Sequence, residues 1–171
     1  MQKDRHKLAH INPDHYLQTE QGRFWTPERS QKAWEQAYSD FEKVLSDQNG
    51  NAIVYIVFGV QGGGKTTWIN RHKPHLPCVY FDAALPARKH RIRALSVARL
   101  HAEYIVAVWI KTPLEHALNH NSQRQVDEMV PEHALRSVYE QLDPPTLSEG
   151  FDKIMIIEPG DFPVAQSKDA L

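Results

Sequence analysis

The chain has 171 residues, of which 41% are hydrophobic and 24% are charged, and its formal net charge is −1. This length suits one domain with a substantial core, and the near-neutral charge excludes a global basic field that would attract nucleic acid. Cys78 is the only cysteine, which excludes an intrachain disulfide and favours a reducing compartment.

The N-terminal segment up to about residue 25 is polar and has few candidates for core positions. Its charged start, residues 1–7, is not followed by the apolar stretch of a secretory signal, and no later run reaches the length of a membrane span. We therefore expect a cytoplasmic protein without a membrane partner. Asn12-Pro13-Asp14 indicates a turn, and we predict a poorly specified arm around it.

A helix is predicted to begin at Thr26-Pro27-Glu28, because Thr suits the N-cap, Pro the first helical position and Glu the first turn. Apolar residues then recur at helical spacing and form one face, which consists of Ala33, Trp34, Ala37, Tyr38, Phe41, Val44 and Leu45. The pattern favours packing of this face against a sheet, and a binding surface is the alternative. Residues 1–50 thus form an arm and an amphipathic helix.

The strongest signal is a glycine-rich stretch between a strand pattern and a helix pattern. Residues 52–58 are a continuous apolar run, and residues 59–66 fill every fixed position of G-x-x-x-x-G-K-[ST]. Glycines let successive N–H groups face one concavity, Lys65 can reach the β- and γ-phosphates, and the Thr66 hydroxyl can ligate Mg²⁺. The alternative is a glycine-rich turn with an accidental Lys-Thr pair. The residues predicted to bind ATP here are Gly59, Gln61, Gly62, Gly63, Gly64, Lys65, Thr66 and Thr67.

A short helix should follow the loop and end at Pro74 and Pro77. Residues 78–81 form a second strand pattern, which delivers Asp82 at the carboxyl end, where open α/β sheets bind ligands. Asp82 has two possible functional roles, as a ligand in the Mg²⁺ shell or as the base that accepts a proton from the attacking hydroxyl. The alternative is a helix N-cap or a surface turn acid.

A further helix is predicted over residues 87–100. Its basic residues are Arg88, Lys89, Arg91, Arg93 and Arg99. At about 100° per residue these charges spread round the helix and do not form a stripe. A solvated face is the default interpretation, and contact of one or two arginines with phosphate or an oligonucleotide is the alternative.

Residues 104–110 are a continuous apolar run of strand length, which is typical of a central strand in a parallel sheet. Thr112 and Pro113 should serve as the N-cap and the first residue of a helix that continues through Leu118.

The polar segment from about 119 to 131 has no core pattern, and we predict a mobile lid that brings Arg124 over the phosphates. Another helix is predicted over residues 131–142 and a last strand over residues 153–157, before a polar tail at 159–171. The histidines show no paired spacing that would indicate a zinc site.

With these segments in view, the chain resembles the P-loop kinases that include polynucleotide 5′-hydroxyl kinases and zeta-toxin-like enzymes. The resemblance covers about residues 52–157. The motifs that carry it are Thr112-Pro113-Leu114-Glu115, Asn121-Ser122-Gln123-Arg124, Val130-Pro131 with Arg136, and Pro145-Thr146-Leu147-Ser148-Glu149-Gly150-Phe151.

The resemblance implies an α/β P-loop NTPase fold of three layers, with a mainly parallel sheet of about four to five strands, a helical N-terminal extension and a helical lid. The kinase core would span residues 51–158. In that family two arginines flank the lid asparagine, and the second contacts the phosphates; Arg124 matches the second, and His120 replaces the first. The family's base follows its second strand and another strand comes later, whereas here both are compressed into one strand that ends at Asp82.

We therefore expect an ATP-dependent kinase that transfers the γ-phosphoryl group to a hydroxyl acceptor. Its catalytic residues would be Lys65, Asp82 and Arg124, and its metal ligands Thr66 and Asp82. By resemblance the acceptor would be a polynucleotide 5′-hydroxyl. Two alternatives stay open: a kinase for a small molecule such as a nucleoside or sugar, and an ATP-binding regulatory module that uses its lid as a switch.

Overall fold

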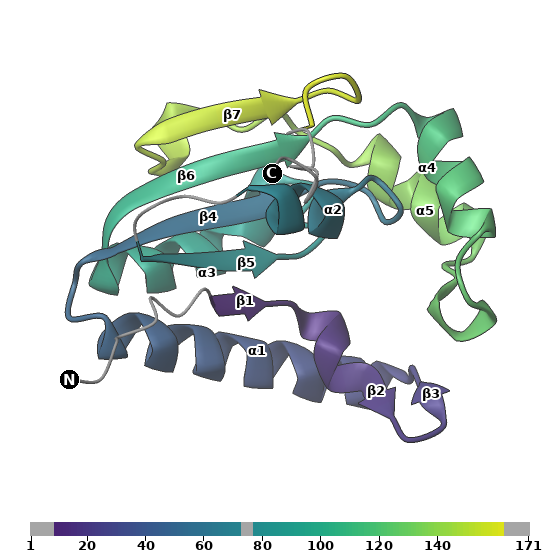
Figure 1. The fold of residues 1–171 in the computed structure, drawn as a ribbon, viewed down its shortest axis with the longest axis horizontal. Coiled ribbons are helices and arrows are strands. Elements are labelled where there is room, and N and C mark those ends of the chain that lie inside the picture. Colours follow the sequence, from purple (N-terminus) through teal and green to yellow (C-terminus); the bar gives the residue numbers. More distant parts are fainter. Residues whose placement is uncertain (1–8, 73–76, 163–171) are drawn as a thin grey trace, which may run out of the picture.

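A five-stranded parallel sheet forms the centre of the fold, with the strand order β1-β5-β4-β6-β7 (Figure 1). The computed structural model describes residues 9–72 and 77–162 of the chain. In sheet order the strands are β1 (Ala9–Ile11), β5 (Cys78–Asp82), β4 (Ala52–Phe58), β6 (Ala102–Ile110) and β7 (Lys153–Ile157). The predicted α/β class with a mainly parallel sheet is confirmed.

The central strand β4 pairs with β5 on one side and with β6 on the other. Its side chains are buried on both faces of the sheet: Val54 and Ile56 belong to one apolar cluster, and Val57 belongs to the cluster on the opposite face. A strand covered on both faces needs apolar side chains in both directions, which explains the continuous apolar run of residues 52–58.

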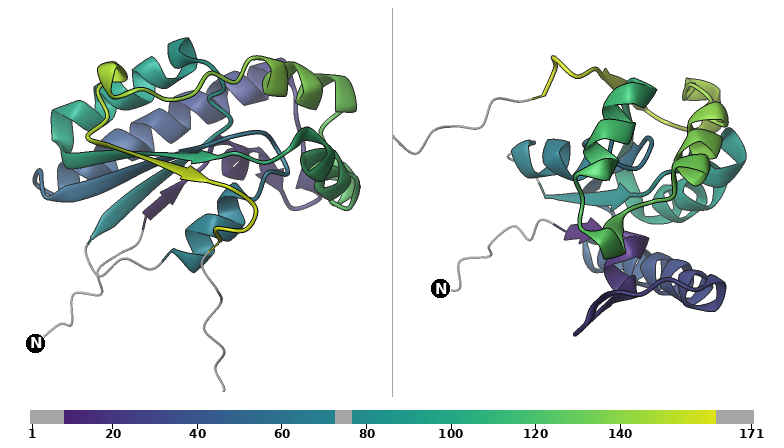
Figure 2. Two further views of the ribbon diagram at one scale, coloured as in Figure 1. Left: turned by 90° about the horizontal axis from the view of Figure 1, so that it is seen from above. Right: turned by 90° about the vertical axis from the view of Figure 1, so that its right-hand side faces the viewer.

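Helices cover both faces of the sheet and produce three layers (Figure 2). α1 (Pro27–Asp47) and α3 (Arg88–His101) pack on one face, whereas α2 (Lys65–Arg71) packs on the other. Pro74, which was expected to help end α2, lies outside the described residues. No helix within the two described ranges is long and apolar enough to cross a membrane.

The predicted start and packing of α1 are confirmed. Thr26 is the N-cap, and its Oγ1 accepts a hydrogen bond from the backbone N–H of Arg29 at 3.1 Å. The rings of Tyr38 and Phe41 lie 5.1 Å and 4.8 Å from the ring of Phe81 on β5, measured between centroids. The aromatic face of α1 therefore packs against the sheet, as its spacing favoured.

The expectation of a poorly specified N-terminal arm is wrong for residues 9–25. β1 extends the main sheet by pairing in parallel with β5, and β2 (Gln18–Thr19) forms an antiparallel hairpin with β3 (Gly22–Arg23). Strands of two or three residues show no usable hydrophobic period, so their sequence does not reveal them. Residues 1–8 of the arm and residues 163–171 of the predicted tail lie outside the described residues.

The turn predicted at Asn12-Pro13-Asp14 is present at the carboxyl end of β1. The side-chain oxygen of Asn12 accepts a hydrogen bond from the backbone N–H of Asp14 at 2.9 Å, and a 3-10 helix over Pro13–Leu17 follows. This local bond is the reason why Asn suits the first position of the turn.

α4 (Leu114–Ser122) and α5 (Glu132–Glu140) lie next to each other beyond the carboxyl ends of the strands (Figure 1). The helix expected over residues 131–142 thus has slightly shorter bounds. The two helices pack round a small separate cluster, whose buried members are Val60, Ala117 and Leu135.

The predicted bounds of α4 need two corrections. Its N-cap is Pro113 and not Thr112, and the helix continues to Ser122 and does not end near Leu118. The hydroxyl of Thr112 is engaged elsewhere, because it donates a hydrogen bond to the carbonyl oxygen of Gly63 at 2.6 Å. Part of the segment predicted as a lid is therefore helical.

The basic run on α3 is largely held in ion pairs within the chain. Arg91 is fully buried, so the expectation of a solvated face is wrong for this residue. The ion-pair partners are Glu149 for Arg91, Glu35 for Arg93 and Asp152 for Arg99, at N···O distances of 2.8, 2.8 and 3.2 Å.

Candidate functional site

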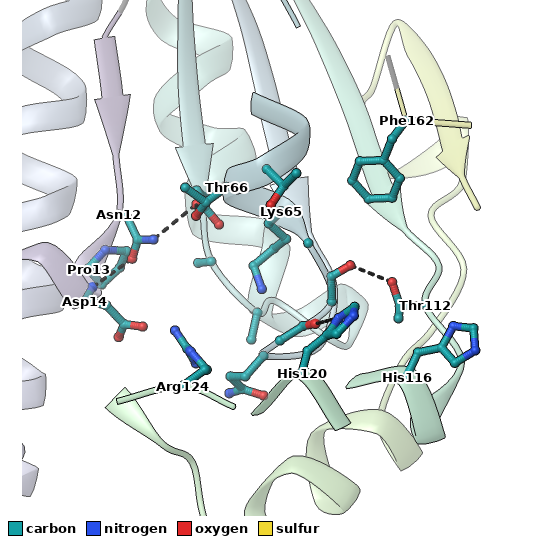
Figure 3. A pocket seen from close by; sticks show the side chains of 18 of the residues that line it. Asn12, Pro13, Asp14, Lys65, Thr66, Thr112, His116, His120, Arg124 and Phe162 are labelled. Atoms are coloured by element: carbon teal, nitrogen blue, oxygen red, sulfur yellow. Dashed lines mark hydrogen bonds between the residues drawn. The ribbon is translucent and has the colours of Figure 1, made fainter. Parts of the chain in front are cut away.

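A pocket with a volume of about 750 Å³ lies at the carboxyl end of the sheet (Figure 3). Its floor is the glycine-rich loop (residues 59–66), which joins β4 to α2, and its walls come from the N-terminal segment, the end of α4 and the chain after β7. The pocket brings together most of the residues that the sequence indicated, namely Gln61, Gly62, Gly63, Gly64, Lys65, Thr66, Thr67, Asp82 and Arg124.

The loop has a backbone that requires glycine at Gly59 and Gly62, where φ is +149° and +72°. A Cβ at these positions would lie 2.6 Å from the carbonyl oxygen of Ile110 and 2.8 Å from that of Ala117. Gly59 does not line the pocket as predicted, because it is buried under the loop and its N–H donates to the carbonyl oxygen of Ala84 at 3.2 Å.

Lys65 begins α2 and folds back over the loop. Its Nζ donates hydrogen bonds to the carbonyl oxygens of Gly59 at 3.1 Å and Val60 at 3.0 Å. Burial lowers the pKa of Lys65, and the carboxylates of Asp82 and Asp14 act in the opposite direction. The lysine thus places a cationic group in the lining of the pocket, next to the backbone of the loop.

Asp82 is the last residue of β5 and is fully buried. Its Oδ2 lies 2.9 Å from Nε2 of His10 and accepts hydrogen bonds from Nδ2 of Asn12 at 3.1 Å and from the hydroxyl of Thr66 at 3.3 Å. The alternative of a surface turn acid or a helix N-cap is therefore wrong, and the N-cap of α3 is Ala87.

The second oxygen of Asp82, Oδ1, is buried and accepts no hydrogen bond from any described residue. Burial alone raises the pKa of this carboxyl, but the hydrogen bond from His10 and the charge of Lys65 outweigh it, so the pKa is lowered. The result is an ionised carboxylate next to the Thr66 hydroxyl that has a free acceptor site.

His10 and Asn12 are site residues that the sequence did not indicate. They belong to β1 and the turn after it, and the register that pairs Ile11 with Phe81 places Asn12 beside Asp82. Parallel strands end at the same edge of a sheet, so pairing alone brings these side chains together. The turn signal at Asn12 was visible in the sequence, but its neighbour across the sheet was not.

The lid (residues 119–131) is held to the loop and to itself by side chains near the end of α4. Asn121 is buried and bridges the backbone of Val130, donating to its carbonyl oxygen at 2.7 Å and accepting from its N–H at 3.0 Å. Nδ1 of His120 lies 3.0 Å from the carbonyl oxygen of Gly62. These hydrogen bonds hold the segment predicted as a lid against the glycine-rich loop.

Arg124 lines the pocket together with the glycine-rich loop. In Figure 3 its guanidinium group points toward the carboxylate of Asp14, on the same side of the pocket as Lys65. Phe162 and His116 line the opposite side of the loop. The pocket therefore contains the cations Lys65 and Arg124, with the acidic Asp14 on one flank and Phe162 and His116 on the other.

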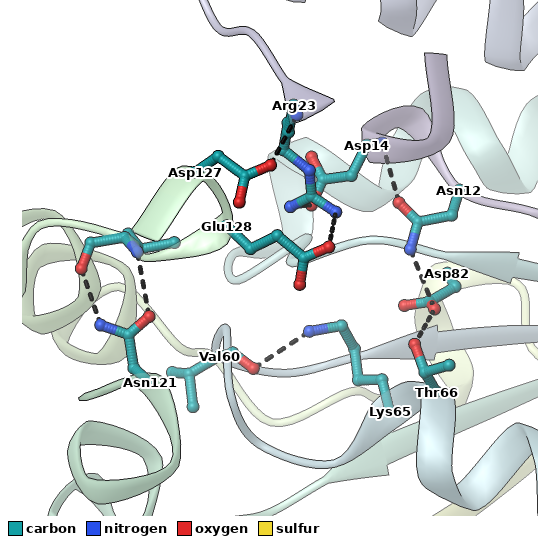
Figure 4. A network of polar contacts seen from close by, with 11 residues as sticks. Asn12, Asp14, Arg23, Val60, Lys65, Thr66, Asp82, Asn121, Asp127 and Glu128 are labelled. Carbon is teal, nitrogen blue, oxygen red and sulfur yellow. Dashed lines mark hydrogen bonds and ion pairs between the residues drawn. The ribbon is translucent and has the colours of Figure 1, made fainter. Parts of the chain in front are cut away.

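A second contact joins the lid to the N-terminal hairpin, and we call it the clasp (Gly22, Arg23, Asp127 and Glu128; Figure 4). The backbone N–H of Arg23 donates to Oδ2 of Asp127 at 2.6 Å, and its guanidinium lies 3.8 Å from Glu128 and 3.5 Å from Asp14. Gly22 has a φ of +106°, and a Cβ there would lie 2.7 Å from Asp127. The hairpin therefore fits closely against the lid.

Replacing Arg23 by Ala is expected to loosen the lid, because the ion pairs to Glu128 and Asp14 are lost while the fold of the sheet is untouched. Hydrogen exchange of peptides from residues 119–131 should accelerate about fivefold, which corresponds to about 1 kcal/mol of local stability. Arg136→Ala is the matched control, since it removes only an exposed pair with Glu132 on α5. Equal exchange in the two variants would contradict the role of the clasp.

The donors and acceptors that line the pocket could hold a polyanion and a divalent cation. Main-chain amides of the loop, Lys65 and Arg124 can neutralise anionic oxygens, and the carboxylate of Asp82 lies beside the hydroxyl of Thr66. The chain matches no protein-family model and no curated protein with which it was compared. Its function must therefore be inferred from these residues.

Proposed function

We propose that the protein is an ATP-dependent phosphotransferase of the P-loop kinase type, which transfers the γ-phosphoryl group of ATP to a hydroxyl acceptor. The observation that carries the proposal is the convergence of the glycine-rich loop, Lys65, Arg124 and the Thr66–Asp82 pair in one pocket. The resemblance of residues 52–157 to P-loop kinases supports the same assignment. A nucleoside triphosphate fits these residues, because its phosphate oxygens need several hydrogen-bond donors and a metal ion.

Thr66 and Asp82 are the residues that would hold Mg²⁺. Oδ1 of Asp82 is buried and accepts no hydrogen bond within the described part of the chain, which leaves lone pairs for a cation or its bound water. Protein sites for Mg²⁺ usually supply one or two groups and leave the other positions to phosphates and water, so a cluster of three acids or histidines is not needed. When bound there, Mg²⁺ would supply positive charge that offsets the charge developing on the phosphate oxygens.

The other residues take roles that follow from their positions. Lys65 lies on the loop and Arg124 on the lid, and both line the pocket, so both can stabilise negative charge on the transferred group. Asp82 is fully buried and lies beside the hydroxyl of Thr66, and its Oδ2 already faces His10 and Asn12, which suits a fixed ligand better than a base that must meet an acceptor hydroxyl. We therefore assign Asp82 to the metal shell and not to the removal of the acceptor's proton.

A nucleotide-dependent regulatory module is the second candidate, and the clasp is the observation that favours it. A lid held by Arg23 to an N-terminal hairpin is an element that a bound nucleotide could bias between two arrangements. Such a module would bind ATP through the same loop and would transfer little or no phosphate.

The deciding experiment uses ATP labelled at the γ-phosphate with Mg²⁺ and a panel of nucleosides, sugars and 5′-hydroxyl oligonucleotides. Label in an acceptor, abolished by chelation of Mg²⁺, is the expected result. Nucleotide binding with release of free phosphate only, or without any turnover, would support the regulatory module. Failure of the protein to bind ATP at all would contradict both candidates.

A further inference from the structure

We propose that residues 12–34 build an acceptor subsite, and that it takes a small uncharged nucleoside-like molecule, in which a hydroxyl lies beside an aromatic ring. This inference rests on the proposed phosphoryl transfer and names its acceptor. It starts from the lining of the pocket, where Asp14, Trp25, Ser30 and Trp34 form a flank that neither the loop nor the lid supplies.

The strand order decides which flank faces the acceptor. The loop follows the central strand β4, so phosphates bound there have β1 and β5 on one side and β6 and β7 on the other. Thr112, His116 and Phe162 occupy the flank of β6 and β7, and the ring of Phe162 lies against Gly64 of the loop. This flank suits the nucleoside part of ATP, which leaves the flank of β1 and β5 for the acceptor.

Two tryptophans give the acceptor flank an aromatic surface. Trp25 has 62% of its surface exposed although it is large and apolar, and Trp34 is half-buried on α1, where its ring lies 6.0 Å from that of Tyr38. Ser30 lies one helical turn before Trp34 and adds a hydroxyl to the same wall. Exposed aromatic faces next to a polar group bind flat rings by stacking and orient them by a hydrogen bond.

The charges of this flank argue against a polynucleotide strand. Asp14 is the only charged residue that segment 12–34 contributes to the lining of the pocket, and its carboxylate would repel a phosphate backbone. On the basic helix α3, Arg91, Arg93 and Arg99 are paired with carboxylates of the chain, and the exposed Arg88 and Lys89 do not line the pocket. The pocket volume of about 750 Å³ is also in the range of small-molecule sites.

Asp14 lies where it can accept the proton of the acceptor hydroxyl during transfer. The side chain of Asp14 is half exposed and points into the pocket toward Arg124. The acceptor hydroxyl oxygen forms a bond to the γ-phosphorus while the bond from that phosphorus to the β–γ bridging oxygen breaks. ADP leaves with that electron pair, and the proton of the hydroxyl passes to the carboxylate of Asp14.

The test compares wild type with four variants of the full chain, using labelled ATP and nucleosides, pyranose sugars and a 5′-hydroxyl oligonucleotide as acceptors. Trp25→Ala should raise the KM for the nucleoside about tenfold or more and leave the KM for ATP unchanged, because only ring stacking is lost. Phe24→Ala is the matched control, since Phe24 is the exposed neighbour of Trp25 and does not line the pocket; it should change neither value. Asp14→Asn should lower kcat about a hundredfold or more with nucleotide binding retained.

The outcomes separate this inference from the proposed function. A preference for the oligonucleotide or for sugars without an aromatic ring, or equal effects of Trp25→Ala and Phe24→Ala, would overturn the acceptor subsite while phosphoryl transfer stands. Absence of label in every acceptor, with ATP bound, would refute phosphoryl transfer itself. Titration of a nucleoside into the protein loaded with Mg²⁺ and a non-hydrolysable ATP analogue measures the nucleoside affinity without turnover. The affinity should fall in Trp25→Ala and return in Trp25→Phe, which keeps an aromatic ring.

Discussion

Replacement of Lys65 by Ala is expected to reduce phosphoryl transfer about a thousandfold and to leave the fold intact. Lys65 lines the pocket with its Nζ hydrogen-bonded to carbonyl oxygens of the loop, from where it can reach the phosphates. A preorganised cation that meets developing charge contributes mainly to the transition state, and removal of one such group costs about a hundred- to a thousandfold in rate. Steady-state rates with labelled ATP measure the loss.

The control for this variant is Lys89→Ala, which removes an exposed lysine from α3 that does not line the pocket. Its transfer rate should equal that of wild type. Circular dichroism and thermal unfolding without nucleotide should be nearly the same for all three proteins, whereas stabilisation by ATP and Mg²⁺ should disappear in Lys65→Ala only. Full activity of Lys65→Ala would show that the glycine-rich loop is not part of the catalytic site.

The largest effect on stability is expected for Glu149→Gln, which should lower the free energy of unfolding by about 3 kcal/mol. Arg91 is fully buried, its Nε and Nη2 donate to the carboxylate of Glu149 at 2.8 and 2.9 Å, and its Nη1 donates to the carbonyl oxygens of Leu85, Pro86 and Asp143. Loss of the anion leaves the guanidinium buried without its counter-charge. For a chain of this size the melting temperature should fall by about 6 to 12 °C.

The same pair predicts how stability depends on pH. Burial raises the pKa of Glu149, but hydrogen bonds from Arg91 and from the backbone of Thr146 outweigh it, so the folded pKa lies below the ordinary value of 4.5. A lowered folded pKa stabilises the protein above the unfolded pKa, and this contribution is lost as the pH falls through the folded pKa. The stability difference between wild type and Glu149→Gln should therefore shrink below about pH 4.5.

Glu132→Gln is the matched control for this pair. Glu132 also contacts an arginine, Arg136, at 2.8 Å, but both side chains are largely exposed on α5. An exposed ion pair is screened by water, so the change in stability should stay below about 0.5 kcal/mol at any pH. If both variants lost the same stability, burial of the Arg91 pair would not matter to the fold.

The buried Arg91–Glu149 pair also contacts the segment that follows β5 and leads away from the site. Arg91 donates to the carbonyl oxygens of Leu85 and Pro86, which follow Asp82 by a few residues, and Leu85 has a positive φ of 40°. A conformation that L-residues rarely adopt persists only where its surroundings hold it. The basic run on α3, which invited a nucleic-acid interpretation, thus includes a residue that holds the site's backbone.

Local signals explain which parts of the fold were predictable. Thr26 and Pro27 mark the start of α1, because capping and the fixed φ of proline act within one turn. β4 and β6 were recognisable as continuous apolar runs, since burial on both faces leaves no polar position. The start of α4 was misplaced because Thr112 bonds across the site to Gly63 and does not cap its own helix.

The sequence by itself determined the glycine-rich loop, the strands beside it and the position of Asp82 at a strand end, because backbone preference and hydrophobic period depend on neighbours along the chain. Only the tertiary structure decided that His10 and Asn12 bind Asp82, that Arg91 is buried and that tryptophans of the N-terminal segment face the loop. Each of these contacts joins residues far apart in the chain, so it exists only after β1 has paired with β5 and the helices have packed on the sheet.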